Sequence, residues 1–226
     1  MVLCQWEAYR LSQQAIPLGL VYITLAGTMA IYGTDHWAER GFQSVLSSRH
    51  HSHWPLDFIA LVAIVILGIS GLKHLGLVGF SWLAILGLSG SVYLLTTWGK
   101  AFDIPCFKEL LGAWCFTYLV WGMLDGGIDA LRLAFFSMGL ANFLHSNYQD
   151  RARDHENHLP SFAYDRPVIV RFLAKTFALF SAALFALNAG FSPLTFCAIF
   201  HFFWPFKNKA SIDWAFLPML ATPFFL

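Results

Sequence analysis

The stretch LDFIALVAIVILGISGL, residues 56–72, is followed after Lys73 and His74 by LGLVGFSWLAILGLSGSVYLLTT, residues 75–97. The two runs contain one charged residue, Asp57, and their apolar residues are continuous instead of alternating with polar ones. A helix crosses the roughly 30 Å hydrocarbon layer of a bilayer with about 20 apolar residues. The pattern therefore predicts two membrane-spanning helices in this part of the chain.

The composition of the whole chain supports this prediction. Of the 226 residues, 58% are hydrophobic and 12% are charged, whereas soluble domains have about 45–50% and about 25%. One soluble core cannot bury so much apolar surface, so the excess is expected to face lipid. Lipid permits only helices or closed barrels, because backbone polar groups find no water there. The long continuous runs favour helices, so the expected fold class is all-α.

Six further apolar segments bring the expected number to about eight, in a single transmembrane helical domain covering residues 1–226. The segments are residues 15–34, 56–72, 75–97, 107–124, 128–149, 170–190, 191–206 and 212–226. The last two are short and contain prolines, so they are expected to be tilted, broken or half-inserted. The first residues, MVLCQWEAYR, lack the basic region of a cleavable signal peptide.

The basic residues are distributed unevenly between the two sides of such a bundle. If all eight segments cross, one side carries eleven of the fourteen Lys and Arg residues: Arg40, Arg49, Lys100, Lys108, Arg151, Arg153, Arg166, Arg171, Lys175, Lys207 and Lys209. The positive-inside rule assigns this side to the cytoplasm. The formal net charge is only +1, which gives no reason to expect a nucleic-acid partner.

The fifth segment continues into a polar stretch, Asn142-Phe-Leu-His-Ser-Asn-Tyr-Gln-Asp150-Arg-Ala-Arg-Asp154. In a helix, Asn142, Ser146, Asp150 and Asp154 would form one ridge, because residues four apart lie on the same side. Stacked carboxylates repel each other unless a cation lies between them, and such oxygen ligands suit Mg²⁺. The alternative is a solvated helix end whose mixed charges neutralise one another.

A second acidic pair, Asp35 and Glu39, follows the first segment, and the predicted topology places it on the same cytoplasmic side. Two such ridges at one end of a bundle can hold two metal ions and a diphosphate between them. Other polar residues are expected to be structural. His201 lies in an aromatic run as a core histidine, and Asp125 and Asp129 lie in a turn and helix cap on the opposite side.

Three stretches together resemble the UbiA-type intramembrane prenyltransferases. TLAGTMAIYGTDHWAER, residues 24–40, is similar to their first acidic motif, and GLANFLHSNYQDRARDHENHLPSFA, residues 139–163, to their second. PCFKELLGAWCFTYLVWG, residues 105–122, is similar to the segment between them. The matches occur in the family's order and cover most of the chain. The resemblance implies the family's nine-helix bundle, here without its first helix.

The resemblance also implies an activity, the transfer of an isoprenoid from an allylic diphosphate to a small or aromatic acceptor that dissolves in lipid. It implies Mg²⁺ as cofactor, membrane lipids as surroundings, and Asp35, Asp150 and Asp154 as catalytic residues. The implied metal ligands are Asp35, Glu39, Asn142, Asp150 and Asp154. Diphosphate oxygens are expected to contact Lys108, Arg40, Arg49 and Arg153, since Arg and Lys bind phosphate with charge-assisted hydrogen bonds.

Three positions depart from the family pattern: Glu39 replaces the usual closing Asp of the first motif, Ile31 stands where that motif opens with Asn, and Ser146 stands where the second often has an acidic residue. Ile31, Ser146 and the missing first helix favour an alternative, a non-catalytic membrane protein of the same fold that is degenerate or binds a partner in a lipid pathway. A small transporter is a third alternative, although its acidic residues would be expected near the bilayer midplane.

Overall fold

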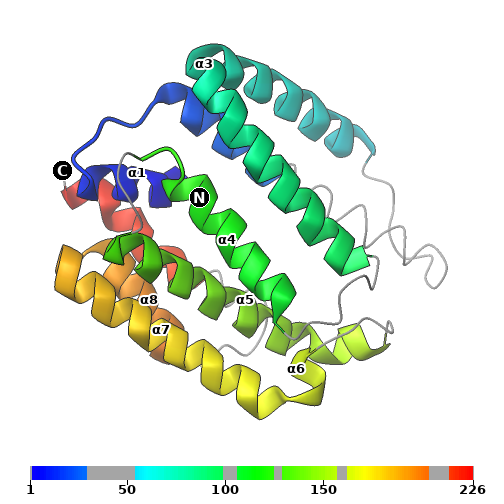
Figure 1. Cartoon of the computed structure of the whole chain (residues 1–226), viewed down its shortest axis with the longest axis vertical. Helices are drawn as coiled ribbons and strands as arrows, with labels where there is room; N and C mark the ends of the chain where they lie inside the picture. The colour runs from blue at the N-terminus through cyan, green and yellow to red at the C-terminus, as the bar shows by residue number, and fades with distance from the viewer. Residues whose placement is uncertain are drawn as a thin grey trace. The chain divides into compact units, whose positions relative to one another are not determined.

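The computed structural model of the protein describes residues 2–29, 54–98, 106–124, 129–156, 162–203 and 214–225. The regular elements in these ranges are all helices (Figure 1), so the predicted all-α class is confirmed. Besides a helix over Leu18–Met29, they are α1 (Val2–Leu11), α3 (Trp54–Trp98), α4 (Phe107–Trp121), α5 (Ala130–Glu156), α6 (Phe162–Asp165), α7 (Pro167–Ala189), α8 (Pro193–Phe203) and the 3-10 helix η1 (Trp214–Phe225).

Several boundaries differ from those predicted. The break expected between residues 72 and 75 lies at Gly76 and interrupts α3. The φ of Gly76 is 61°, a backbone conformation that glycine adopts more readily than other residues. Helix α5 ends at Glu156 instead of residue 149, so it includes the polar stretch. Helix α1 was not predicted, because its residues do not form a continuous apolar run.

Residues pack into two compact units, Met1–Val2 with Ala15–Leu83 and Leu3–Gln14 with Ala84–Leu226. The expectation of a single domain remains a prediction. In the first unit, the Leu18–Met29 helix packs closely on the first part of α3. A Cβ added at Gly71 would lie 2.9 Å from the carbonyl oxygen of Gly19, and the rings of Tyr22 and His74 meet edge to face at 6.0 Å. Two glycines therefore allow the backbones of this helix pair to approach.

We expect Gly19→Val to destabilise the protein and Gly27→Val to have a much smaller effect. A Cβ at position 19 would lie 2.9 Å from the Gly71 carbonyl oxygen, and backbone atoms cannot move cheaply. Overpacking of this kind costs about 1–3 kcal/mol. A Cβ at position 27 meets no described atom within 4 Å. Thermal unfolding of the two variants in detergent measures the difference, and equal melting temperatures would contradict the close helix contact.

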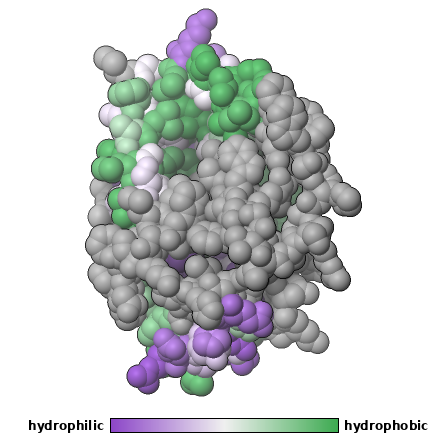
Figure 2. Space-filling view, turned by 90° about the vertical axis from the view of Figure 1, so that its right-hand side faces the viewer, coloured by the Kyte–Doolittle hydropathy of each residue, from purple (hydrophilic) through white to green (hydrophobic). Residues whose placement is uncertain are grey.

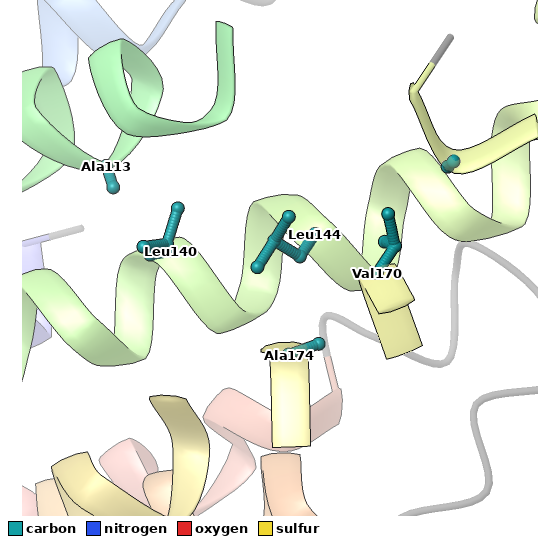
Figure 3. Close-up of a cluster of buried hydrophobic side chains, with 6 residues drawn as sticks. Ala113, Leu140, Leu144, Val170 and Ala174 are labelled. Carbon is teal, nitrogen blue, oxygen red and sulfur yellow. The ribbon is translucent and has the colours of Figure 1, made fainter. Parts of the chain in front are cut away.

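In the second unit, α5 lies between α4 and α7, and the short helix α6 connects α5 to α7 (Figure 1). A buried cluster joins these helices (Figure 3), with Leu140 and Leu144 of α5 between Ala113 of α4 and the α7 residues Val170 and Ala174. The Ser181 hydroxyl donates a hydrogen bond to the Ala134 carbonyl oxygen at 2.7 Å, which also ties α7 to α5. The cluster fixes the position of α5, the helix that carries the predicted ridge.

Helix α7 has mostly small residues on its inner side, together with the fully buried Phe185, and large apolar residues on its outer side. Its buried positions include Val170, Ala174, Ala178 and Ala182, spaced by four residues along one side. Its outer side exposes Val168, Phe172, Leu179 and Leu187. Small residues let two helices pack closely, whereas a row of large exposed apolar side chains is rare on soluble monomers. The distribution is therefore typical of a helix with lipid on its outer side.

Helix α1 is buried within the second unit although it is only ten residues long. The Gln5 side-chain amide donates a hydrogen bond to the Leu119 carbonyl oxygen of α4 at 2.8 Å. Glu7 is fully buried and forms an ion pair with Arg10 at 2.6 Å. This hydrogen-bonded pairing raises the pKa of Arg10 above its usual value. The contacts explain how a polar helix is accommodated inside the unit.

Within the described residues, one helix is long and apolar enough to cross a membrane, and it is α7. Its 23 residues extend about 35 Å, against a hydrocarbon layer of about 30 Å. Shorter apolar helices are Leu18–Met29, Leu61–Gly76, Gly79–Tyr93 and Pro193–Phe203. The prediction of about eight spans remains a prediction.

Candidate functional site

The candidate site is built on α5, which runs without interruption from Ala130 to Glu156. Asp129 begins the helix as predicted for a cap, because its Oδ1 accepts a hydrogen bond from the Arg132 backbone N–H at 2.8 Å. Since the helix is continuous, Asn142, Ser146, Asp150 and Asp154 fall on one side of it, four residues apart. The backbone of α5 therefore has the helical geometry that the predicted ridge requires.

Two predicted metal ligands on the ridge have described side chains, Asn142 and Asp150. The Asn142 Oδ1 is buried and makes no hydrogen bond to the described residues, which is uncommon for a buried oxygen. The Asp150 side chain is half-buried. Eight residues of helix separate the two by about 12 Å along the axis, so one ion cannot contact both. A metal ion at Asp150 would need further ligands from the neighbouring turn or from another element.

Glu109 of α4 is an acidic residue that the sequence-based reasoning missed. It is only 4% exposed, and its Oε1 accepts a hydrogen bond from the Asn147 side-chain amide of α5. Asn147 lies one turn before Asp150, so Glu109 joins the same end of α5. The sequence signal that could have identified Glu109 is an acidic residue at the start of an apolar segment, next to the predicted phosphate ligand Lys108. The Lys108 side chain is half-buried.

Cys106 lies just before α4 at this end of the unit. Burial and then the nearby Glu109 carboxylate raise the pKa of its thiol to about 11. The thiol is therefore protonated at neutral pH, and only a thiolate is a good nucleophile or metal ligand. Cys106 does not add to the chemistry of the ridge.

The remaining predicted site residues lie outside the described set. Asp35, Glu39, Arg40 and Arg49 belong to the undescribed stretch 30–53, and the side chains of Arg153 and Asp154 are not described although their backbone is helical. The convergence of the two acidic ridges therefore remains a prediction. Among the described residues alone, no group of three or more His, Cys, Asp or Glu is placed to hold a metal ion.

His201 is a core residue, as its aromatic surroundings predicted. Its side chain is fully buried and meets the Phe216 ring of η1 edge to face at 5.2 Å. Such packing explains the histidine without a metal or a catalytic role.

Comparisons with protein-family models, with curated proteins and with solved structures found no match to the chain.

Proposed function

We propose that the protein is a multi-pass membrane prenyltransferase of the UbiA-like kind, which moves an isoprenoid from an allylic diphosphate to a small or aromatic acceptor. The observation that carries the proposal is the uninterrupted α5, which aligns Asn142, Ser146, Asp150 and Asp154 four residues apart, with Asp150 and Asp154 beyond its buried apolar part. The buried Glu109 adds a carboxylate at the same end. A helix end that was only a solvated charge mixture would give no reason to bury Glu109 beside Asn147.

Membrane placement is supported by α7 and by the polarity of the second unit. The large apolar residues of α7 face outward, where water would disfavour them and lipid would not. Hydrophilic residues gather at the lower end of Figure 2, where α6 and the adjoining ends of α5 and α7 lie. We assign this end to the cytoplasmic side, since it holds Arg151, Arg166 and Arg171.

The end of the ridge suits Mg²⁺ because its donors are carboxylate oxygens; Asn142, about 12 Å further along the helix, would not share an ion with Asp150. Asp35, Glu39, Asp150 and Asp154 would hold the metal. When bound, Mg²⁺ would neutralise diphosphate charge and so make diphosphate a better leaving group. Lys108, Arg40, Arg49 and Arg153 would donate hydrogen bonds to the remaining phosphate oxygens.

The reaction balances without a redox partner. The bond between the allylic carbon and the diphosphate oxygen breaks, and the electron pair leaves with the oxygen. The acceptor's nucleophilic atom then bonds to the allylic carbon and loses a proton to solvent or to a carboxylate. The chain's own contribution is to bind and orient the two substrates and to exclude water from the allylic cation.

The proposal is tested with purified protein in detergent, Mg²⁺ and labelled allylic prenyl diphosphates of several lengths. Quinone precursors, tetrapyrroles and lipid alcohols serve as acceptors, and both diphosphate release and prenylated product are measured. We expect product formation that stops when EDTA removes the metal. Absence of both binding and turnover with every diphosphate would instead support a non-catalytic protein of the same fold.

A further inference from the structure

A pocket of about 490 Å³ lies between the end of α5 and the start of α7. Three of its lining side chains are cationic, Arg151 from α5 and Arg171 and Lys175 from α7. The described residues that line it include no carboxylate. The ion pair between Glu7 and Arg10 involves none of the three. The pocket is therefore a concentration of positive charge without a described counter-ion.

Two of the cations are held in place by aromatic rings. The Arg151 guanidinium lies 4.0 Å from the centre of the Tyr148 ring, and it also donates a hydrogen bond to the Tyr148 carbonyl oxygen. The Lys175 ammonium lies 5.7 Å from the centre of the Phe202 ring. Contacts of this kind orient a cation without neutralising it. The arrangement is suited to an anion with several oxygen atoms, such as a phosphate.

The pocket opens onto an apolar surface of α7. Val168 and Phe172 line it and are 80% and 67% exposed, and Leu179 further along is 54% exposed. At about 100° per residue these three lie within about 40° of one another around the helix. The cationic pocket and the exposed apolar row are thus continuous, as an amphiphile with a phosphate and acyl chains requires. A soluble phosphate would contact the cationic side chains but would leave the exposed apolar residues of α7 uncovered.

On α5, the Tyr148 side of this pocket lies away from Asp150 of the candidate catalytic ridge, while Arg151 of the pocket is three residues from Asp154. Tyr148 lines the pocket, whereas Asp150 lies on the ridge two residues later. Two residues correspond to about 200° around a helix, so the two side chains leave α5 on nearly opposite sides. Lys108, the expected phosphate ligand whose side chain is described, does not line the pocket.

We propose that this pocket binds the phosphate of an anionic phospholipid of the cytoplasmic leaflet, with the acyl chains along the outer side of α7. Anionic lipids are concentrated in that leaflet and attract basic residues near the membrane surface. Lipid binding here requires the membrane placement proposed above and is independent of prenyl transfer. Its failure and the failure of the enzyme assay are thus separate results.

The test uses the full chain, purified and delipidated in detergent, with native mass spectrometry to measure lipid binding. The probes are dioleoylphosphatidylglycerol, which is anionic, and dioleoylphosphatidylcholine, which has a phosphate but no net charge. We expect the first to bind more tightly. The Arg171→Gln/Lys175→Gln variant should weaken its binding about tenfold or more, since each basic residue near an anionic lipid contributes about fivefold.

The matched control is Lys73→Gln/Arg166→Gln, which removes the same charge from two exposed residues that do not line the pocket. It should bind the anionic lipid like wild type. Circular dichroism and gel filtration check folding, and Lys175→Gln alone, with an expected fivefold loss, replaces the double variant if that variant misfolds. Equal binding by pocket and control variants would overturn the proposal. So would tight binding of the zwitterionic lipid or displacement of the anionic one by inorganic phosphate.

Discussion

Asp150→Asn is expected to lower the rate of prenyl transfer roughly a thousand-fold or more, which corresponds to about 4 kcal/mol of transition-state stabilisation. The amide keeps the shape of the side chain and the helix, but it removes a negative charge from a half-buried position. The proposed metal would then be held less tightly where diphosphate charge develops. The measurement is the rate of diphosphate release at saturating prenyl diphosphate and Mg²⁺.

The control for this change is Asp129→Asn at the other end of the same helix. Its Oδ1 caps α5 through the Arg132 backbone N–H, and an asparagine oxygen caps a helix about as well. Asp129→Asn therefore removes one charge from the region of α5 while keeping the cap, and it should retain nearly full turnover. Equal activity of wild type and Asp150→Asn would refute the metal role of Asp150.

Leu144→Ala is expected to destabilise the protein by about 2–5 kcal/mol, the usual cost of removing a leucine from a close-packed site. Leu144 is 1% exposed in the cluster that joins α4, α5 and α7. The cavity left behind loses packing contacts with both neighbouring helices. Unfolding of the purified protein in detergent, followed by circular dichroism, measures the loss.

Leu133→Ala is the matched control, because it makes the same change on the same helix at a residue that is 42% exposed. It should cost much less than Leu144→Ala, since few contacts are lost there. If both variants lost the same stability, the buried cluster would not be what holds α5 between its neighbours.

Much of the fold followed from apolar runs and punctuating residues. The boundary predicted between residues 190 and 191 is found where Gly190, with a φ of 63°, ends α7 and Ser192 caps α8 by accepting a hydrogen bond from the Thr195 N–H. The break was predicted at Lys73 and His74, a few residues before Gly76. These polar residues interrupt the apolar run, whereas the backbone leaves the helical conformation at the glycine.

The apolar pattern did not predict helix α1 or the 3-10 geometry of η1. Helix α1 buries the charged Glu7, which has no apolar signal and is stabilised by Arg10. The last segment was predicted as a short or broken span, and it forms the 3-10 helix η1 over Trp214–Phe225. The choice between 3-10 and α geometry depends on packing that apolar periodicity does not describe.

The sequence by itself determined the helical class, the excess of apolar surface and the four-residue spacing of Asn142, Ser146, Asp150 and Asp154. These are local properties, since continuous apolar runs and residue intervals act within one helix. Only the tertiary structure decided that Glu109 is buried against Asn147 and that Arg151, Arg171 and Lys175 share a pocket. Such contacts join residues on different helices, and no interval along the chain determines which sides of two helices face each other.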